Sequence, residues 1–119
     1  MVGDQASAGK YSNDGFNDTD NRYVWSMATT ADGLYVGTSN RNGCQVYLYN
    51  NTSGWTALVK TPDSEEPITE EPNGFGERLN FGARSMIEYP LNSKNIFLGT
   101  FTSYWMRKEV GCEIWARYT

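Results

Sequence analysis

The chain of 119 residues contains no histidine and only two cysteines. The missing histidine removes the commonest general base, the commonest metal ligand and the usual activator of a serine or cysteine nucleophile. Two cysteines cannot build a thiolate zinc site alone. The glycine-rich stretch GFGERLN (residues 74–80) lacks the lysine and the helix that follow in a phosphate-binding loop. We therefore assign no catalytic residues and no cofactor, and we expect that the protein is not an enzyme.

Glycoside hydrolysis is the disfavoured enzymatic alternative, because it needs only two carboxylic acids placed about 5–9 Å apart. Glu88 and Glu113 lie within predicted strands, but neither has an identifiable partner in the sequence. Both acids are better explained as solvated or ion-paired side chains.

Long apolar runs and an excess of positive charge are also missing. No stretch approaches the roughly 18 apolar residues that cross a bilayer, and residues 1–15 have neither the basic start nor the apolar run of a signal peptide. The formal net charge of −4 argues against binding to a phosphate backbone. We expect no transmembrane segment and no nucleic-acid partner, while a signal removed by processing stays open.

What the chain does contain is a series of motifs that occurs twice in the same order. GFNDTDNRYVWSM begins at Gly15 and GFGERLNFGARSM begins at Gly74; an apolar hexamer ending in Gly-Thr and then a Gly-Cys pair follow each one. The matched residues are 59 positions apart at Gly15, 62 at Gly37 and 68 at Cys44. A register broken only by short insertions is typical of duplicated supersecondary units.

The content of each unit predicts short strands joined by tight turns, as in an antiparallel meander. The predicted strands are residues 22–30, 34–38, 44–49 and 55–60 in the first unit, and 84–89, 95–100 and 112–118 in the second. One such sheet is marginally stable until its faces are covered, and stacked sheets of this kind form a β-propeller. The predicted fold is all-β: antiparallel four-stranded propeller blades, about two repeats, with the second lacking its outer strand. Such a ring is incomplete unless other chains or repeats join it.

The predicted organisation has four parts. They are an N-terminal tail (1–14), a first blade repeat (15–60), an acidic proline-containing loop (61–73) and an incomplete second blade repeat (74–119). The acidic loop holds five carboxylates and three prolines, which favours an extended, solvated segment. An acidic docking or cation-collecting strip is the alternative.

The pattern Gly-Phe-Gly…Asn…Ser-Met…Leu-Tyr-Val-Gly-Thr…Gly-Cys-Glu-Ile-Trp resembles a repeat of secreted or cell-surface bacterial and archaeal β-propeller proteins, most of which have no assigned function. The resemblance covers residues 15–60 and 74–118 and implies a secreted or cell-surface location. The stretch YNNTSGWT also resembles a degenerate Asp-box of sialidase-type propellers, but Ser53 stands where that motif has its aspartate. No catalytic residue carries over from either resemblance.

Two groups of residues are candidates for binding. The second unit carries an insertion after Phe101, and Tyr104, Trp105 and Arg107 in it are the residue types that dominate recognition hot spots and stack on sugar rings. Their alternative role is packing against a neighbouring blade. Asp18 and Asp20, in a cluster of Asp and Asn, could ligate calcium, although such clusters more often brace turns.

Two pairs of matched residues are predicted to be structural. Asn21 and Asn80 are expected to brace the entry to the inner strand of each unit by bonding to the backbone. Cys44 and Cys112 are expected to be two buried thiols, because equivalent points on neighbouring blades usually lie farther apart than the ~7 Å that a disulfide spans. A bridge between them is the alternative.

These features favour a non-catalytic β-propeller-type module of a secreted or cell-surface protein, acting in recognition or assembly. Its partners would be its own kind or further blade repeats, and a glycan or a surface protein. A carbohydrate-binding lectin whose short chains oligomerise into a closed propeller is one alternative, and a self-assembling structural subunit is another.

Overall fold

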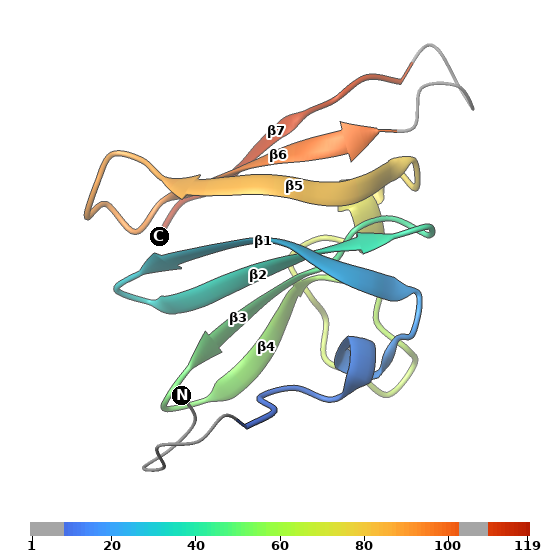
Figure 1. Cartoon of the computed structure of the whole chain (residues 1–119), viewed down its shortest axis with the longest axis horizontal. Coiled ribbons are helices and arrows are strands. Elements are labelled where there is room, and N and C mark those ends of the chain that lie inside the picture. The colour runs from blue at the N-terminus through green and yellow to red at the C-terminus, as the bar shows by residue number, and fades with distance from the viewer. Residues whose placement is uncertain (1–8, 103–109) are drawn as a thin grey trace.

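The protein is described by a computed structural model, which covers residues 9–102 and 110–119. In that part of the chain the structure has seven β-strands, two short 3₁₀ turns and no α-helix, so the predicted all-β class is confirmed (Figure 1). None of its helical segments is long and apolar enough to cross a membrane. The elements are η1 (Asp14–Asn17), β1 (Asn21–Thr30), β2 (Gly33–Asn40), β3 (Val46–Asn50), β4 (Gly54–Val59), η2 (Asn73–Gly76), β5 (Asn80–Glu88), β6 (Ile96–Thr102) and β7 (Ile114–Arg117).

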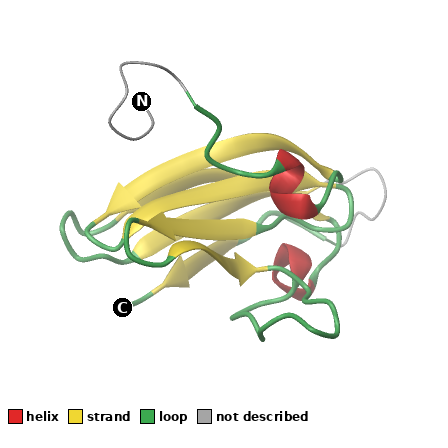
Figure 2. Cartoon of the chain, turned by 90° about the horizontal axis from the view of Figure 1, so that it is seen from below, coloured by secondary structure: helices red, strands yellow, loops and turns green. Residues whose placement is uncertain are grey.

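The strands form one curled antiparallel sheet. Strands β1 to β4 pair in chain order, and so do β5 to β7. A single pairing of Ser39 in β2 with Gly82 in β5 joins these two groups. Because the junction is so narrow, the sheet bends there, and the β5–β7 group packs against the β1–β4 group, above it in Figure 1. Both 3₁₀ turns lie at the same end of the strands (Figure 2).

We call residues 14–50 the first segment and residues 73–117 the second segment. The described parts of the two segments with matched motifs adopt matched conformations. Gly15 and Phe16 have φ/ψ of 58°/21° and 55°/38°, and Gly74 and Phe75 have 63°/19° and 58°/35°. These left-handed angles suit glycine but are rare for phenylalanine. The first strand of each segment also carries two register shifts at matched positions, between Asn21 and Tyr23 and between Val24 and Ser26 in β1, and between Asn80 and Gly82 and between Ala83 and Ser85 in β5.

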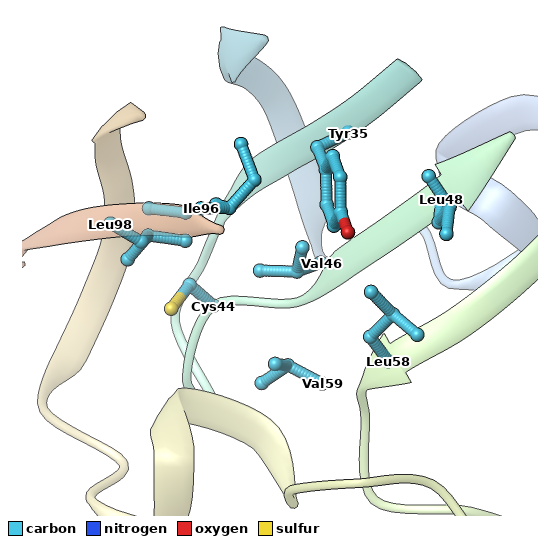
Figure 3. Close-up of a cluster of buried hydrophobic side chains, with 9 residues drawn as sticks. Tyr35, Cys44, Val46, Leu48, Leu58, Val59, Ile96 and Leu98 are labelled. Carbon is cyan, nitrogen blue, oxygen red and sulfur yellow. The ribbon is translucent and has the colours of Figure 1, made fainter. Parts of the chain in front are cut away.

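The hydrophobic core lies between the two groups of strands. Burying apolar side chains between facing sheets is the main stabilising contribution in such a fold. Side chains from both groups meet there (Figure 3). The buried members are Tyr35, Cys44, Val46, Leu48, Leu58, Val59, Ala83, Ile96 and Leu98.

The third strand of each segment begins two residues later than the sequence predicted, at Val46 and at Ile114. In the first segment the reason is visible at Cys44, whose backbone leaves the ladder of β2 and β3 to bond with the second segment. The Cys44 N–H donates to Asn80 O at 2.8 Å, and the Gly74 N–H donates to Cys44 O at 2.8 Å. These two bonds fasten the segments to each other along the main chain.

The acidic stretch 61–73 is mostly exposed but is anchored at its end. The Glu70 N–H donates to Leu58 O at 3.0 Å, and the Lys60 N–H donates to Glu71 O at 2.9 Å. The returning chain therefore lies along the end of β4 and brings Glu70 beside the second segment.

Candidate functional site

A buried asparagine organises the start of β1. The Asn21 side-chain amide donates to Gly15 O at 2.9 Å and to Gln45 Oε1 at 2.7 Å. Its oxygen accepts from Thr38 Oγ1 at 2.8 Å and from Asn40 Nδ2 at 2.9 Å. All four hydrogen-bonding positions of the amide are used, which is the arrangement expected of a structural polar group inside a protein.

Asn80 occupies the same place at the start of β5. Its amide donates to Gly74 O at 3.0 Å and to Glu113 Oε1 at 2.9 Å, and its oxygen accepts from Thr102 Oγ1 at 2.9 Å. Glu113 therefore has a partner that the sequence did not reveal, because Asn80 lies 33 positions away. Glu88 in turn accepts through its side chain from the Lys94 N–H at 2.9 Å.

An aromatic stack covers each of these junctions. The Phe16 and Tyr47 rings lie 4.2 Å apart with an interplanar angle of 11°, and the Phe75 and Trp115 rings lie 4.6 Å apart at 14°. Each third-strand aromatic also donates to the side-chain oxygen that accepts from the asparagine: Tyr47 OH donates to Gln45 at 2.7 Å, and Trp115 Nε1 donates to Glu113 at 2.8 Å. Burial raises the pKa of Tyr47, so this hydroxyl stays protonated and serves as a fixed donor.

The two candidate calcium ligands bind other side chains of the fold. Asp18 Oδ2 accepts from Gln45 Nε2 at 3.0 Å and from Asn40 Nδ2 at 3.3 Å. Asp20 accepts from Asn42 Nδ2 at 2.9 Å and lies 3.3 Å from the Arg41 guanidinium. Within residues 9–102 and 110–119, no three acidic or thiol side chains gather as they would around a metal ion. Calcium binding stays a prediction from the sequence.

The three candidate binding residues of the insertion, Tyr104, Trp105 and Arg107, lie outside the described residues. Their role in recognition stays a prediction.

A cavity of about 160 Å³ opens between the two groups of strands, and no pattern in the sequence predicted it. Its walls include Tyr35, Phe75 and Trp115. Glu71 is one of its charged members, and the other two are Glu70 and Arg117. These two charged residues are 47 positions apart in the sequence, so no local pattern could have paired them. We call this cavity the inter-sheet pocket.

Two of the three charged residues of the inter-sheet pocket, Glu70 and Arg117, are paired with each other. Arg117 Nε donates to Glu70 Oε1 at 3.0 Å, and Arg117 Nη2 donates to Glu70 Oε2 at 3.0 Å, which is the two-pronged geometry typical of arginine and carboxylate. Arg117 Nη1 donates to the Tyr35 hydroxyl at 2.6 Å. The bond to Glu70 raises the pKa of Arg117, and burial raises the pKa of Tyr35. The pocket therefore offers a fixed ion pair and a neutral phenol rather than an activated base.

The two cysteines differ, which corrects the prediction of two buried thiols. Both are free, but Cys44 is buried and Cys112 is exposed. Burial raises the pKa of the Cys44 thiol to about 12. Cys44 is buried because the second segment covers it, and no described residue covers Cys112 in the same way.

Two outer faces of the molecule expose apolar side chains whose counterparts are buried. Val24 in β1 is 54% exposed, whereas its counterpart Ala83 in β5 is completely buried. Ile114 in β7 is 78% exposed, whereas its counterpart Val46 in β3 is 4% exposed. The matched motifs in the sequence were the one sign of these two exposed faces. A position that is buried in one segment is expected to be buried in the other as well, once a neighbour packs on it.

Comparison with protein-family models, with curated proteins and with solved structures finds no match for this chain. The function is therefore argued from the geometry of the molecule.

Proposed function

We propose that the protein is a non-catalytic β-propeller-type module of a secreted or cell-surface protein and that its main role is assembly with units of its own kind. The observation that carries this proposal is the contact between the two segments. One face of the first segment packs on the second segment, and main-chain hydrogen bonds from Cys44 fasten the two. In this proposal the two segments belong to consecutive blades: the first blade consists of the first segment and β4, and the second blade has no described counterpart of β4.

The chemistry of the described residues supports a binding role over a catalytic one. The buried polar groups at Asn21 and Asn80 are engaged by neighbours in the fold, and Arg117 is paired with Glu70. Groups that are saturated in this way hold a structure in place and are poor proton acceptors or nucleophiles. The secreted or cell-surface location rests on the resemblance of the repeated motif.

The assembly role is tested by sedimentation velocity over a wide range of protein concentration. We expect species larger than one chain, either one closed stoichiometry or a broad distribution of open chains. A single monomeric species at every concentration would contradict the assembly role. An activity screen on glycosides tests the non-catalytic assignment, and turnover that Glu113→Gln abolishes would overturn it.

Carbohydrate binding is the second candidate function, and the inter-sheet pocket favours it. Aromatic walls from Tyr35 and Trp115 beside the Glu70–Arg117 pair combine an apolar surface with groups that can bond to sugar hydroxyls. NMR titration with a panel of monosaccharides and oligosaccharides should then shift the Trp115 indole signal. The Arg117→Gln variant should lose that shift, whereas Arg84→Gln, on an exposed position of β5, should keep it.

The same panel tests the insertion. Loss of glycan binding in Trp105→Ala, with the Trp115 signal unchanged, would place the sugar site on the insertion instead of in the pocket. No shift with any member of the panel would reject the carbohydrate-binding alternative.

A further inference from the structure

We propose that a second copy of this chain docks head-to-tail on the first, by repeating the contact that joins the two segments inside one chain. The face of one copy that carries Gly99, Cys112 and Ile114, here called the tail face, would pack on the face of the next copy that carries Gly15, Asn21 and Val24, here called the head face. The inference rests on the proposed assembly role and names its partner and its residues.

The internal contact supplies the template, and beside its apolar core it contains three hydrogen bonds that end on main-chain groups. The Cys44 N–H donates to Asn80 O, the Cys44 carbonyl accepts from the Gly74 N–H, and Ser26 Oγ donates to Ala83 O at 2.6 Å. The first two bonds use main-chain N–H and carbonyl groups, which every residue except proline carries, and the third uses the Ser26 hydroxyl, whose counterpart is Ser85. A second copy can therefore form the same bonds wherever its backbone has the same shape.

Close approach in the template depends on Gly37 in β2. A Cβ atom at this position would lie 2.5 Å from Ala83 Cβ and 3.1 Å from Met86 Cε, so only glycine lets β5 come so near. Val46, the partner of Gly37 across the β2–β3 ladder, is buried by the same contact.

The tail face repeats these features without any described residue packed on them. Gly99 matches Gly37, and a Cβ atom there would meet only Ser85 Oγ, at 3.1 Å, among the described atoms within 4 Å. Ser85 is the counterpart of Ser26, whose Oγ would lie 2.9 Å from a Cβ atom at Gly37. Within the described part of the chain, no residue fills over Gly99 the room that Ala83 and Met86 fill over Gly37. Ile114, which pairs with Gly99 across the β6–β7 ladder, is left exposed.

The head face repeats the other side of the template. Val24 stands at the position of Ala83, and Met27, which is 61% exposed, stands at the position of Met86. A pocket of about 180 Å³ is lined by Gly15, Asn21 and Val24. At the matching place in the second segment, Gly43 Cα lies 3.1 Å from where a Cβ atom of Gly74 would be. The pocket is therefore where the Gly111–Cys112 backbone of another copy would enter.

Both faces belong to every copy but they differ from each other, so the contact is heterologous: it repeats from chain to chain until a ring closes or an open stack grows. The contact between copies would be smaller than the internal one, because β4 adds Leu58 and Val59 to the internal core and no described strand follows β7. We therefore expect reversible, concentration-dependent association.

The test uses one charged substitution on each face, Val24→Glu on the head face and Ile114→Glu on the tail face. Both positions are exposed in the single chain, so both variants should fold, which far-UV circular dichroism and thermal melting would check. Burying an unpaired carboxylate in the contact should raise the dissociation constant about 100-fold or more, so each variant alone should sediment as a monomer. Thr52→Glu, in the exposed turn between β3 and β4, is the matched control and should associate like the unmodified chain.

Mixing the two variants gives the decisive result. Val24→Glu keeps an intact tail face and Ile114→Glu keeps an intact head face, so the mixture should form a one-to-one dimer and stop there. A mixture that stays monomeric while the unmodified chain associates would reject the head-to-tail arrangement. Association of both variants as strong as that of the unmodified chain would reject these faces but leave the assembly role standing. A monomeric unmodified chain would reject both.

Cys112 gives an independent readout, because docking would bury it as Cys44 is buried inside the chain. Its rate of reaction with a thiol reagent should fall as the concentration of the unmodified chain rises. In Val24→Glu the rate should not depend on concentration. A Cys112 rate that stays constant while the unmodified chain associates would also overturn the proposed contact.

Discussion

The first and second segments have the same turn, the same asparagine junction and the same stacked rings, yet different faces of the two segments are exposed to solvent. Val46 is buried and its counterpart Ile114 is exposed, while Ala83 is buried and its counterpart Val24 is exposed. The motif therefore determines the conformation of each segment, whereas the burial of a side chain depends on which neighbour lies against it.

The junctions also differ in one chemical detail. Gln45 accepts from Asn21 and Tyr47 in the first segment, whereas Glu113 accepts from Asn80 and Trp115 in the second. An amide oxygen and a carboxylate oxygen thus accept the same two hydrogen bonds. What the junction needs is one side-chain oxygen between the asparagine and the aromatic donor, and the formal charge of that group is secondary.

The largest effect should come from removing the junction that lies against the other segment. Asn80→Ala would leave Gly74 O, Glu113 and Thr102 without their buried partner, so we expect a loss of about 4 kcal/mol in the free energy of unfolding. Asn21→Ala should cost less, about 3 kcal/mol, because Asn21 lies beside the open head face, where water can replace part of what is lost. Urea unfolding at low protein concentration measures both, and equal losses would show that the covering segment adds nothing.

Two glycines before the matched cysteines should respond very differently to alanine. Gly43 has φ of 104°, and a Cβ atom there would lie 2.8 Å from Gly74 N and 2.9 Å from Asn73 C, so Gly43→Ala should cost about 3 kcal/mol. A Cβ atom at Gly111 would have no described atom within 4 Å, so Gly111→Ala should change the stability of the single chain by less than about 0.5 kcal/mol. Thermal unfolding of the two variants compares them, and a similar cost at both positions would contradict the described packing.

The buried Cys44 thiol should make the stability of the fold depend on pH. Since burial raises the pKa of Cys44 from 9.0 to about 12, the folded chain holds this proton more tightly than the unfolded chain does. The stabilisation is complete below pH 9 and is lost as the pH rises toward 12; we expect a decrease of about 2 kcal/mol by pH 10.5.

Urea unfolding at a series of pH values measures this loss of stability. Cys44→Ala should remove this contribution to the slope, whereas Cys112→Ala, at the exposed position, should keep it. Burial also raises the pKa of Tyr35 and of Tyr47, so part of the slope should remain in Cys44→Ala. A slope that Cys44→Ala leaves unchanged would assign the whole alkaline sensitivity to the tyrosines.

The smallest effect should follow from making the two junctions alike. Glu113→Gln keeps an oxygen for Asn80 Nδ2 and Trp115 Nε1, so we expect a change of less than about 1 kcal/mol. Glu113→Ala removes the oxygen and should cost about 2 kcal/mol. Chemical denaturation compares the two variants. If Glu113→Gln costs as much as Glu113→Ala, the carboxylate charge matters and the junctions are not equivalent.

Local patterns were sufficient to predict the all-β class and the approximate positions of the strands, because alternation and turn residues act over a few positions. The repeated motif also drew attention to Asn21 and Asn80 before their contacts were known. The partners of Glu113 and the Glu70–Arg117 pair could not be predicted, because they join residues 33 and 47 positions apart. The prediction that Cys112 is buried was wrong for a related reason: the sequence gives the type of a residue, and only the fold shows which residues pack against it.

The seam between the segments has a practical consequence for protein engineering. The bonds of Cys44 and the close approach at Gly37 depend on the shape of the backbone, so a further unit that repeats this backbone and the apolar residues of the core carries its own joint. Fusing additional units in tandem should lengthen the molecule without redesigning each joint, so a rod or ring of chosen size could be specified by copy number alone.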